Sequence, residues 1–378
     1  MARRALIQVE GHPRGNGLRY VQAAKRLGLH PIILSADPSQ YEYLAEDGIA
    51  AVRVNTDTLD ALIHECSKLR RSYDIAGITG TQPCSDEAIL QRAVDLIDWP
   101  NLNKLDGIIM GAFQFLSSRR IIVKIGSTLV ADPETGEIRG PWLETLIEDV
   151  VRFFARGQQL IIVTSGAVAV GSCHFNQLDR SLEIGERQAA AAIGQVRIMR
   201  AYEQAFRRHR FGIGQILLTR EDIDNEHRCL NARSTMQQLL KVGAVPVVNE
   251  NDTIATAEIR FGDNDRLAAR VAQMVNADLL ILLSDVDGLF TEDPRGNPLA
   301  RLVTEVQRIT PEIESMAAHS PALHSSGGMA TKLMAARIAM DAGFAMVIAR
   351  GNKFYPLAAI ENGGLSTWFN VSRRRASK

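Results

Sequence analysis

Six short segments of this chain combine glycine or other small residues with side chains that can bind charged ligands. Glycine lets backbone N–H groups approach phosphate oxygens, and lysine adds a positive charge; Lys124 and Lys332 both lie in such segments. Three other segments contain carboxylates or carboxamides, which suit a small zwitterion. The set therefore predicts phosphoryl transfer to a small zwitterionic substrate. The segments are KIGST (124–128), TSGAVAVG (164–171), NENDTIAT (249–256), GDNDRLAA (262–269), LSDVDGLFTEDPR (283–295) and SGGMATK (326–332).

Several other kinds of catalytic site are excluded by the motifs that the sequence lacks. It has no G-x-x-x-x-G-K-[ST] loop, no H-R-D and D-F-G pair, and no G-x-S-x-G elbow. Its eight histidines do not pair at i, i+4 with an acidic partner, so no zinc site is expected. We expect no metal ligands from protein side chains.

Each of the six candidate ligand-binding segments follows a run of apolar residues that is typical of a buried β-strand. Strands this continuously apolar are covered by helices on both faces, as in parallel sheets, and ligands bind outside the carboxyl ends of such strands. The second part of the chain is therefore predicted to be a three-layer α/β/α sandwich with a mainly parallel sheet. The strand segments are IIVKI, QLIIV, GIGQILLT, AVPVVNE, LLILLS and MVIAR.

The first part of the chain shows a separate alternation of strands and helices, which predicts a Rossmann-like α/β domain over residues 1–112. Its first turn has glycines at positions 11, 15 and 17, which is not a G-x-G-x-x-G pattern, so a tight turn is favoured over a phosphate site. Residues 113–119 are interpreted as a linker and 120–370 as the second domain. Residues 371–378 form a basic tail.

Composition limits the partners of the protein. At 46% hydrophobic residues, the 378-residue chain has ample material for packed cores. The formal net charge of +0 gives no bulk attraction to nucleic acid. No apolar run approaches the roughly 20 residues that cross a bilayer, and four scattered cysteines are typical of a reducing compartment. We expect a cytoplasmic protein that binds neither nucleic acid nor membrane.

The segments VTSGAVAVG, LTREDIDN, VPVVNENDTIATAEIRFGDND, LLSDVDGLFTEDPR and SGGMATK occur in an order and at spacings that resemble the amino acid kinase family. The resemblance covers about residues 119–369 and favours the glutamate 5-kinase branch, for which NEND-x-(V/I)-AT close to GDND is specific. It implies the amino acid kinase fold.

The resemblance also implies roles for individual residues. Lys124 and Lys332 would contact the transferring phosphoryl group, and Asp265 would orient the two lysines. The implied substrate-binding residues are Ser165, Asp252, Asn264 and Asn249. The implied ATP-binding residues are Lys124, Gly126, Ser284, Asp285, Ser326, Gly327, Gly328, Met329, Ala330, Thr331 and Lys332.

By resemblance, the chain would phosphorylate the γ-carboxylate of L-glutamate with ATP and Mg²⁺, giving glutamyl 5-phosphate, the first step of proline biosynthesis. The family further implies a homo-oligomer and a glutamyl phosphate reductase as partner. The alternative is a specialised carboxylate kinase that acts on another amino acid.

The front domain resembles the N-terminal domain of ATP-grasp ligases, on RGNGLRYVQAAKRLGLHPIILSADP and ITGTQ. No ATP-grasp nucleotide-binding domains follow it, so it is not expected to ligate anything alone. A docking or assembly module is the other interpretation of this domain.

Overall fold

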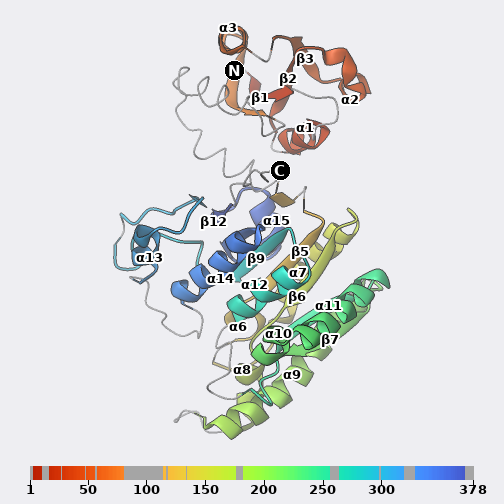
Figure 1. Ribbon diagram of the computed structural model, residues 1–378, viewed down its shortest axis with the longest axis vertical. Helices are drawn as coiled ribbons and strands as arrows, with labels where there is room; N and C mark the ends of the chain where they lie inside the picture. Colours follow the sequence, from red (N-terminus) through yellow and green to blue (C-terminus); the bar gives the residue numbers. More distant parts are fainter. Residues whose placement is uncertain are drawn as a thin grey trace. The chain divides into compact units, whose positions relative to one another are not determined.

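A computed structural model of the chain describes most of its residues, and they form two compact units, Met1–Leu116 and Ser117–Lys378. Each unit is described by itself (Figure 1). The segment DEAILQRAVDLID (86–98), whose pattern predicts a helix, and most of the glycine turn at 11–17 lie outside the described residues. The described ranges are 3–10, 17–26, 28–46, 48–55, 58–80, 114–115, 118–132, 134–175, 182–255, 264–297, 299–318 and 328–370.

The front unit contains a four-stranded parallel sheet in the order β3-β2-β1-β4. One core joins the sheet to α3 through residues such as Ile7, Leu34 and Leu62, and a second core joins it to α1 and α2 through Val21 and Leu44. Helices thus cover both faces, as the Rossmann-like prediction requires. The elements are β1 (Arg3–Glu10), α1 (Gly17–Arg26), β2 (His30–Ser35), η1 (Pro38–Gln40), α2 (Glu42–Glu46), β3 (Ala50–Arg53), α3 (Leu59–Leu69) and β4 (Tyr73–Gly80).

The second unit is built on an eight-stranded sheet in the order β10-β12-β11-β9-β5-β6-β8-β7. Only the β11–β12 pair among the described strands is antiparallel. The central strands are buried along their whole length, because helices cover both of their faces. The strands are β5 (Arg120–Ile125), β6 (Gln159–Val163), β7 (Ile213–Leu218), β8 (Val245–Glu250), β9 (Leu279–Ser284), β10 (Glu305–Val306), β11 (Ala345–Arg350) and β12 (Ser366–Phe369).

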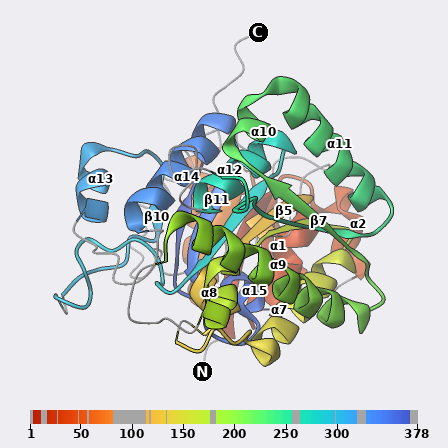
Figure 2. The same cartoon turned by 90° about the horizontal axis from the view of Figure 1, so that it is seen from below.

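The helices of this unit form two layers, with α10, α11, α12 and α14 on one face of the sheet and α7, α8, α9 and α15 on the other (Figure 2). The predicted three-layer, mainly parallel sandwich is therefore confirmed. The helices are α6 (Ser127–Val130), α7 (Gly140–Phe154), α8 (Ala167–Ser172), η2 (Cys173–Phe175), α9 (Ile184–Arg207), α10 (Arg220–Asp224), α11 (Glu226–Lys241), α12 (Asn264–Met274), α13 (Pro311–Ala318), α14 (Met329–Ala342) and α15 (Pro356–Glu361).

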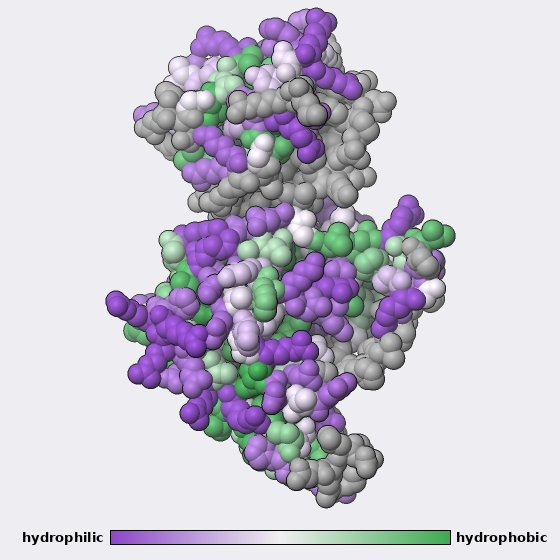
Figure 3. All heavy atoms as spheres, turned by 180° about the vertical axis from the view of Figure 1, so that it is seen from behind, coloured by the Kyte–Doolittle hydropathy of each residue, from purple (hydrophilic) through white to green (hydrophobic). Residues whose placement is uncertain are grey.

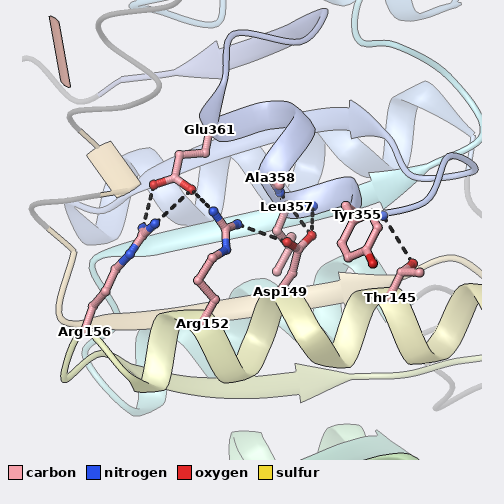
Figure 4. Close-up of polar contacts among 8 residues, drawn as sticks. All are labelled: Thr145, Asp149, Arg152, Arg156, Tyr355, Leu357, Ala358 and Glu361. Atoms are coloured by element: carbon pink, nitrogen blue, oxygen red, sulfur yellow. Dashed lines mark hydrogen bonds and ion pairs between the residues drawn. The ribbon is translucent and has the colours of Figure 1, made fainter. Parts of the chain in front are cut away.

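A buried ionic network fastens the short helix α15 to α7 (Figure 4). Asp149 of α7 accepts hydrogen bonds from the backbone N–H groups of Leu357 and Ala358 at 2.9 and 3.0 Å, at the start of α15. Glu361, at its end, pairs with Arg152 and Arg156. Burial raises the pKa of Asp149, and its hydrogen bonds oppose that rise. The network holds the turn that follows β11 against α7.

The surface of the described residues is mostly polar in the view of Figure 3, with apolar residues in small groups. None of the described helices combines the length and apolar character needed to cross a lipid bilayer.

Helices α8 and α9 approach so closely that only glycine fits at their crossing. A Cβ atom added at Gly171 of α8 would overlap the carbonyl oxygen of Ala190, and one at Gly194 of α9 would overlap that of Ala167. Both neighbours are backbone atoms, which cannot move aside as a flexible side chain can. This crossing fixes α9 against the turn that begins α8.

Gly171→Ala is therefore expected to destabilise the protein by about 2 kcal/mol or more, because the helices must separate to admit the methyl group. Urea unfolding at neutral pH measures the change. Gly185→Ala is the control, since Gly185 lies in the first turn of α9, the helix that contacts α8, and has open space around it. An equal loss in both variants would contradict this account of the crossing.

Candidate active site

Two lysines and one aspartate from distant parts of the chain meet at the carboxyl edge of the large sheet. Lys124 comes from the end of β5, Asp265 from the first turn of α12 and Lys332 from the first turn of α14. The Lys332 Nζ lies 3.0 Å from Asp265 Oδ2, and Lys124 Nζ pairs with Asp265 Oδ1. All three residues are buried, with exposed fractions of 6%, 0% and 4% in chain order. The structure thus brings the three predicted catalytic residues together.

Asp265 carries the negative charge that makes this arrangement stable. Burial acts to raise its pKa, but the charges of Lys124 and Lys332 and their hydrogen bonds outweigh that effect, and the pKa lies below its usual value. The carboxylate is therefore ionised at neutral pH. Two ammonium groups against one carboxylate leave one net positive charge, which favours an anion beside the cluster.

The turns that follow β5 and β6 lie against each other. Gly126 donates its N–H to Leu283 O at 3.1 Å, which ties the first turn to β9. In the second turn, Ser165 Oγ donates to Ile125 O at 2.7 Å, and Gly166 has a φ of 90°, which favours glycine. Gly166, rather than Ser165, occupies the N-cap position of α8. Ser165 therefore serves to join the two turns.

Two of the predicted substrate-binding residues contact each other directly. Asn264 Nδ2 donates to Asn249 Oδ1 at 2.7 Å and to Thr164 O at 2.6 Å. Asn249 Nδ2 donates in turn to Gln195 Oε1 at 2.8 Å. Asp252, the remaining predicted residue of this group, lies half-buried in the turn after β8. The predicted substrate residues thus line the ends of β6 and β8 and the start of α12.

Most of the predicted nucleotide-binding residues that the structure describes lie at the carboxyl end of β9 and at the start of α14. Ser284 Oγ donates to Asp285 Oδ1 at 3.0 Å, and Gly351 N donates to Ser284 O at 2.8 Å. Gly328 caps α14 without a side-chain hydrogen bond, and Thr331 Oγ1 donates to its carbonyl at 2.7 Å. Met329, Ala330 and Lys332 follow in the first turn of α14, while Ser326 and Gly327 lie outside the described residues.

Two polar residues of the site were missed from the sequence. Gln195 contacts Asn249, and the hydroxyl of the fully buried Tyr202 donates to Thr164 Oγ1 at 3.2 Å. Burial raises the pKa of Tyr202, so the hydroxyl stays protonated at neutral pH. Gln195 and Tyr202 lie on the buried face of α9 together with Ile198. Polar residues at core positions of a predicted helix could have indicated that this face contacts the site.

No group of three or more His, Cys, Asp or Glu side chains that could hold a metal ion occurs within the described parts of the chain. The described groups at this edge of the sheet include lysine ammonium groups, side-chain amides and backbone N–H groups. Such a donor set binds anionic groups of a small ligand.

The fold and the lysine–aspartate cluster define a small-molecule site at the carboxyl edge of a parallel sheet. Residues 119–350 match the model of the amino acid kinase family, and the chain belongs to this family.

Curated relatives extend this result. The chain is 75% identical over 256 residues to "Glutamate 5-kinase 2" of Mesorhizobium japonicum, an alignment that covers 68% of this chain and 90% of the relative. It is 55% identical over 264 residues to "Glutamate 5-kinase" of Paramagnetospirillum magneticum, covering 69% and 71%. It is 54% identical over 258 residues to "Glutamate 5-kinase 2" of Rhizobium meliloti, covering 68% and 96%.

Proposed function

We propose that this chain transfers the γ-phosphoryl group of ATP to the γ-carboxylate of L-glutamate and releases glutamyl 5-phosphate and ADP. The observation that carries the proposal is the buried pair Lys124 and Lys332 on Asp265, next to the amides of Asn249 and Asn264. The relatives named glutamate 5-kinase support glutamate over the alternative of another amino acid.

The chemistry needs charge neutralisation rather than a general base. A γ-carboxyl group has an unperturbed pKa of about 4.3, so it is already a nucleophilic anion at neutral pH. The difficulty is the approach of this anion to the anionic phosphoryl group. In-line transfer depends on positioning and on compensating the charge of the equatorial oxygens. Lys124 and Lys332 would bind those oxygens, and Asp265 would hold the two ammonium groups in place.

The remaining predicted residues have matching roles in the proposal. The N–H groups of Gly327 and Gly328 would bind phosphate oxygens, whereas Gly126 already donates its N–H to Leu283 O and would line the phosphate site without that bond. Ser284 and Asp285 would contact the nucleotide. Magnesium would be bound through ATP and would neutralise further phosphate charge. Glutamate would be bound by Ser165, Asp252, Asn249 and Asn264, and the nucleotide loop would be completed by Ser326, Met329, Ala330 and Thr331.

The proposal is tested by measuring ADP release with a panel of amino acids while hydroxylamine traps the acyl phosphate. Glutamate-dependent release with trapped product is the expected result. Release with aspartate or another acid, and none with glutamate, would transfer the assignment to the specialised carboxylate kinase.

We further propose that the product passes to a reductase in the first steps of proline biosynthesis and that the enzyme is a homo-oligomer. The acyl phosphate product is labile in water, which supports transfer to a partner.

For the front unit we propose the fold of the N-terminal domain of ATP-grasp ligases, acting as a docking or assembly module. Its parallel sheet with helices on both faces supports this proposal. Deletion of residues 1–112 is expected to leave glutamate-dependent ADP release unchanged and to alter oligomer size in light scattering. A loss of ADP release in a folded deletion variant would instead place the front unit in catalysis.

A further inference from the structure

Three side-chain amides form a continuous chain beneath the proposed substrate site. Gln195 of α9 accepts from Asn249 at the end of β8, and Asn249 accepts from Asn264 at the start of α12. Asn249 is 1% exposed and Gln195 is 8% exposed. Amides this deeply buried are stable only in an arrangement that pairs their donors with acceptors.

Backbone groups fix which end of each amide faces which neighbour. Glu250 N–H can only donate, and it lies 2.9 Å from Asn249 Oδ1. Thr164 C=O can only accept, and it lies 2.6 Å from Asn264 Nδ2. The Nδ2 group of Asn249 therefore faces Gln195, which must present its oxygen. The orientation of all three amides follows from these two backbone contacts.

This orientation decides what Asn264 can offer to a ligand. Its Nδ2 group has two hydrogens, and both are used, one by Thr164 O and one by Asn249 Oδ1. The group that remains is Oδ1, to which none of the described residues donates a hydrogen bond. An amide oxygen only accepts, so it matches an ammonium group and opposes a carboxylate.

Gln195 has one favourable and one unfavourable polar contact at this position. Its Nε2 atom is buried and has no hydrogen-bond partner within the described residues. An unpaired buried donor lowers stability, so the amide is not explained by packing alone. Its oxygen, however, is the acceptor for Asn249 Nδ2. That oxygen makes the one side-chain hydrogen bond of Gln195 among the described residues.

We propose that Gln195 is a positioning residue, which holds Asn249 so that Asn264 presents its oxygen to the substrate and selects a substrate with a free ammonium group. This inference rests on the proposed function, in which an amino acid accepts the phosphoryl group. Without the Gln195 oxygen, Asn249 Nδ2 becomes an unpaired buried donor. Asn249 Nδ2 regains a partner only if the Asn249 amide rotates. That rotation breaks the hydrogen bond between Asn249 Oδ1 and Asn264 Nδ2.

The test compares two variants that differ in one property. Gln195→Met removes the acceptor and keeps the length of the side chain, whereas Gln195→Glu keeps an acceptor in either protonation state. Gln204→Met, at an exposed position of the same helix, is the control. We measure kcat, KM for glutamate, KM for ATP, and the inhibition constant of glutarate, which lacks the ammonium group. Thermal melting checks the fold.

In Gln195→Met, the KM for glutamate is expected to rise about tenfold, because one amide contact with a charged group is lost. The kcat, the KM for ATP and the glutarate constant should stay within about twofold of wild type. Gln195→Glu should restore the glutamate KM. Equal effects of both variants, parallel shifts for glutamate and glutarate, or an unchanged glutamate KM would each overturn the proposal.

A crystal structure of the wild-type chain with glutamate gives a second result that needs no variant. The substrate nitrogen is expected within hydrogen-bond distance of Asn264 Oδ1, and a substrate carboxylate in that place would overturn the inference. Failure of the proposed function is distinguishable, because the wild-type enzyme would then release no ADP with glutamate.

Discussion

Alanine at Lys332 or Lys124 is expected to lower kcat at least about a hundredfold. Each ammonium group would compensate charge on the transferring phosphoryl oxygens in a buried setting, where one such contact contributes roughly 3–4 kcal/mol to the barrier, as an oxyanion-hole donor does. The loss should appear in kcat, because the charge to be compensated is greatest in the transition state. Steady-state ADP release with saturating glutamate and ATP measures it.

Lys353→Ala is the matched control for both lysine variants. Lys353 is exposed and follows β11, whose carboxyl end lies at the same edge of the sheet. Its removal should leave kcat within about twofold of wild type. Circular dichroism must show folded protein in each case. Near-normal turnover in folded Lys124→Ala or Lys332→Ala would show that the cluster has no part in phosphoryl transfer.

Asp265→Asn is expected to destabilise the protein by about 3 kcal/mol or more at pH 7. Asp265 has no exposed surface and pairs with two ammonium groups that are themselves buried. Removing the charged partner of a buried ion pair leaves the opposite charge uncompensated, which costs about 3–5 kcal/mol. The free energy of unfolding in urea measures the change.

The stability lost in Asp265→Asn is expected to depend on pH. A carboxyl group whose pKa is lowered on folding stabilises the folded state above its unfolded pKa, about 3.9. That contribution disappears as the pH falls through the lower folded-state pKa. The difference in stability between wild type and Asp265→Asn should thus be complete at pH 7 and shrink below about pH 4.

Asp293→Asn provides the comparison for this experiment. The pKa of Asp293 is also lowered, by hydrogen bonds from Arg295, but the pair is at the surface, where ion pairs contribute little. Its replacement should leave stability nearly unchanged. If Asp293→Asn lowered the free energy of unfolding as much as Asp265→Asn does, burial of the cluster would not explain the effect of Asp265→Asn.

The family resemblance implied the lysine–aspartate cluster, and local features of the sequence agree with its members. Lys124 ends a β-branched run, Asp265 begins an amphipathic helix, and Lys332 follows a glycine pair. Strand ends of a parallel sheet meet at one edge, so such residues converge once the sheet is recognised. The fold class followed from the same continuously apolar strands, of which LLILLS is fully buried.

Other features depend on pairings that the sequence does not mark. The short β12 pairs antiparallel with β11, and a four-residue run shows no direction. Asp149 and Glu361 resemble ordinary surface acids, although contacts far along the chain bury them. Gln195 stands within an alanine-rich helix, and its role depends on a contact with Asn249, which no local pattern reveals.

The wide separation of Lys124, Asp265 and Lys332 along the chain has a consequence for biosynthesis. About 200 residues lie between the two lysines, so the cluster depends on contacts between residues far apart in sequence. A ribosome-bound chain that ends before α14 holds Lys124 and Asp265 but lacks the second cation. The nascent chain therefore cannot assemble the proposed phosphoryl site until most of the second unit has been synthesised.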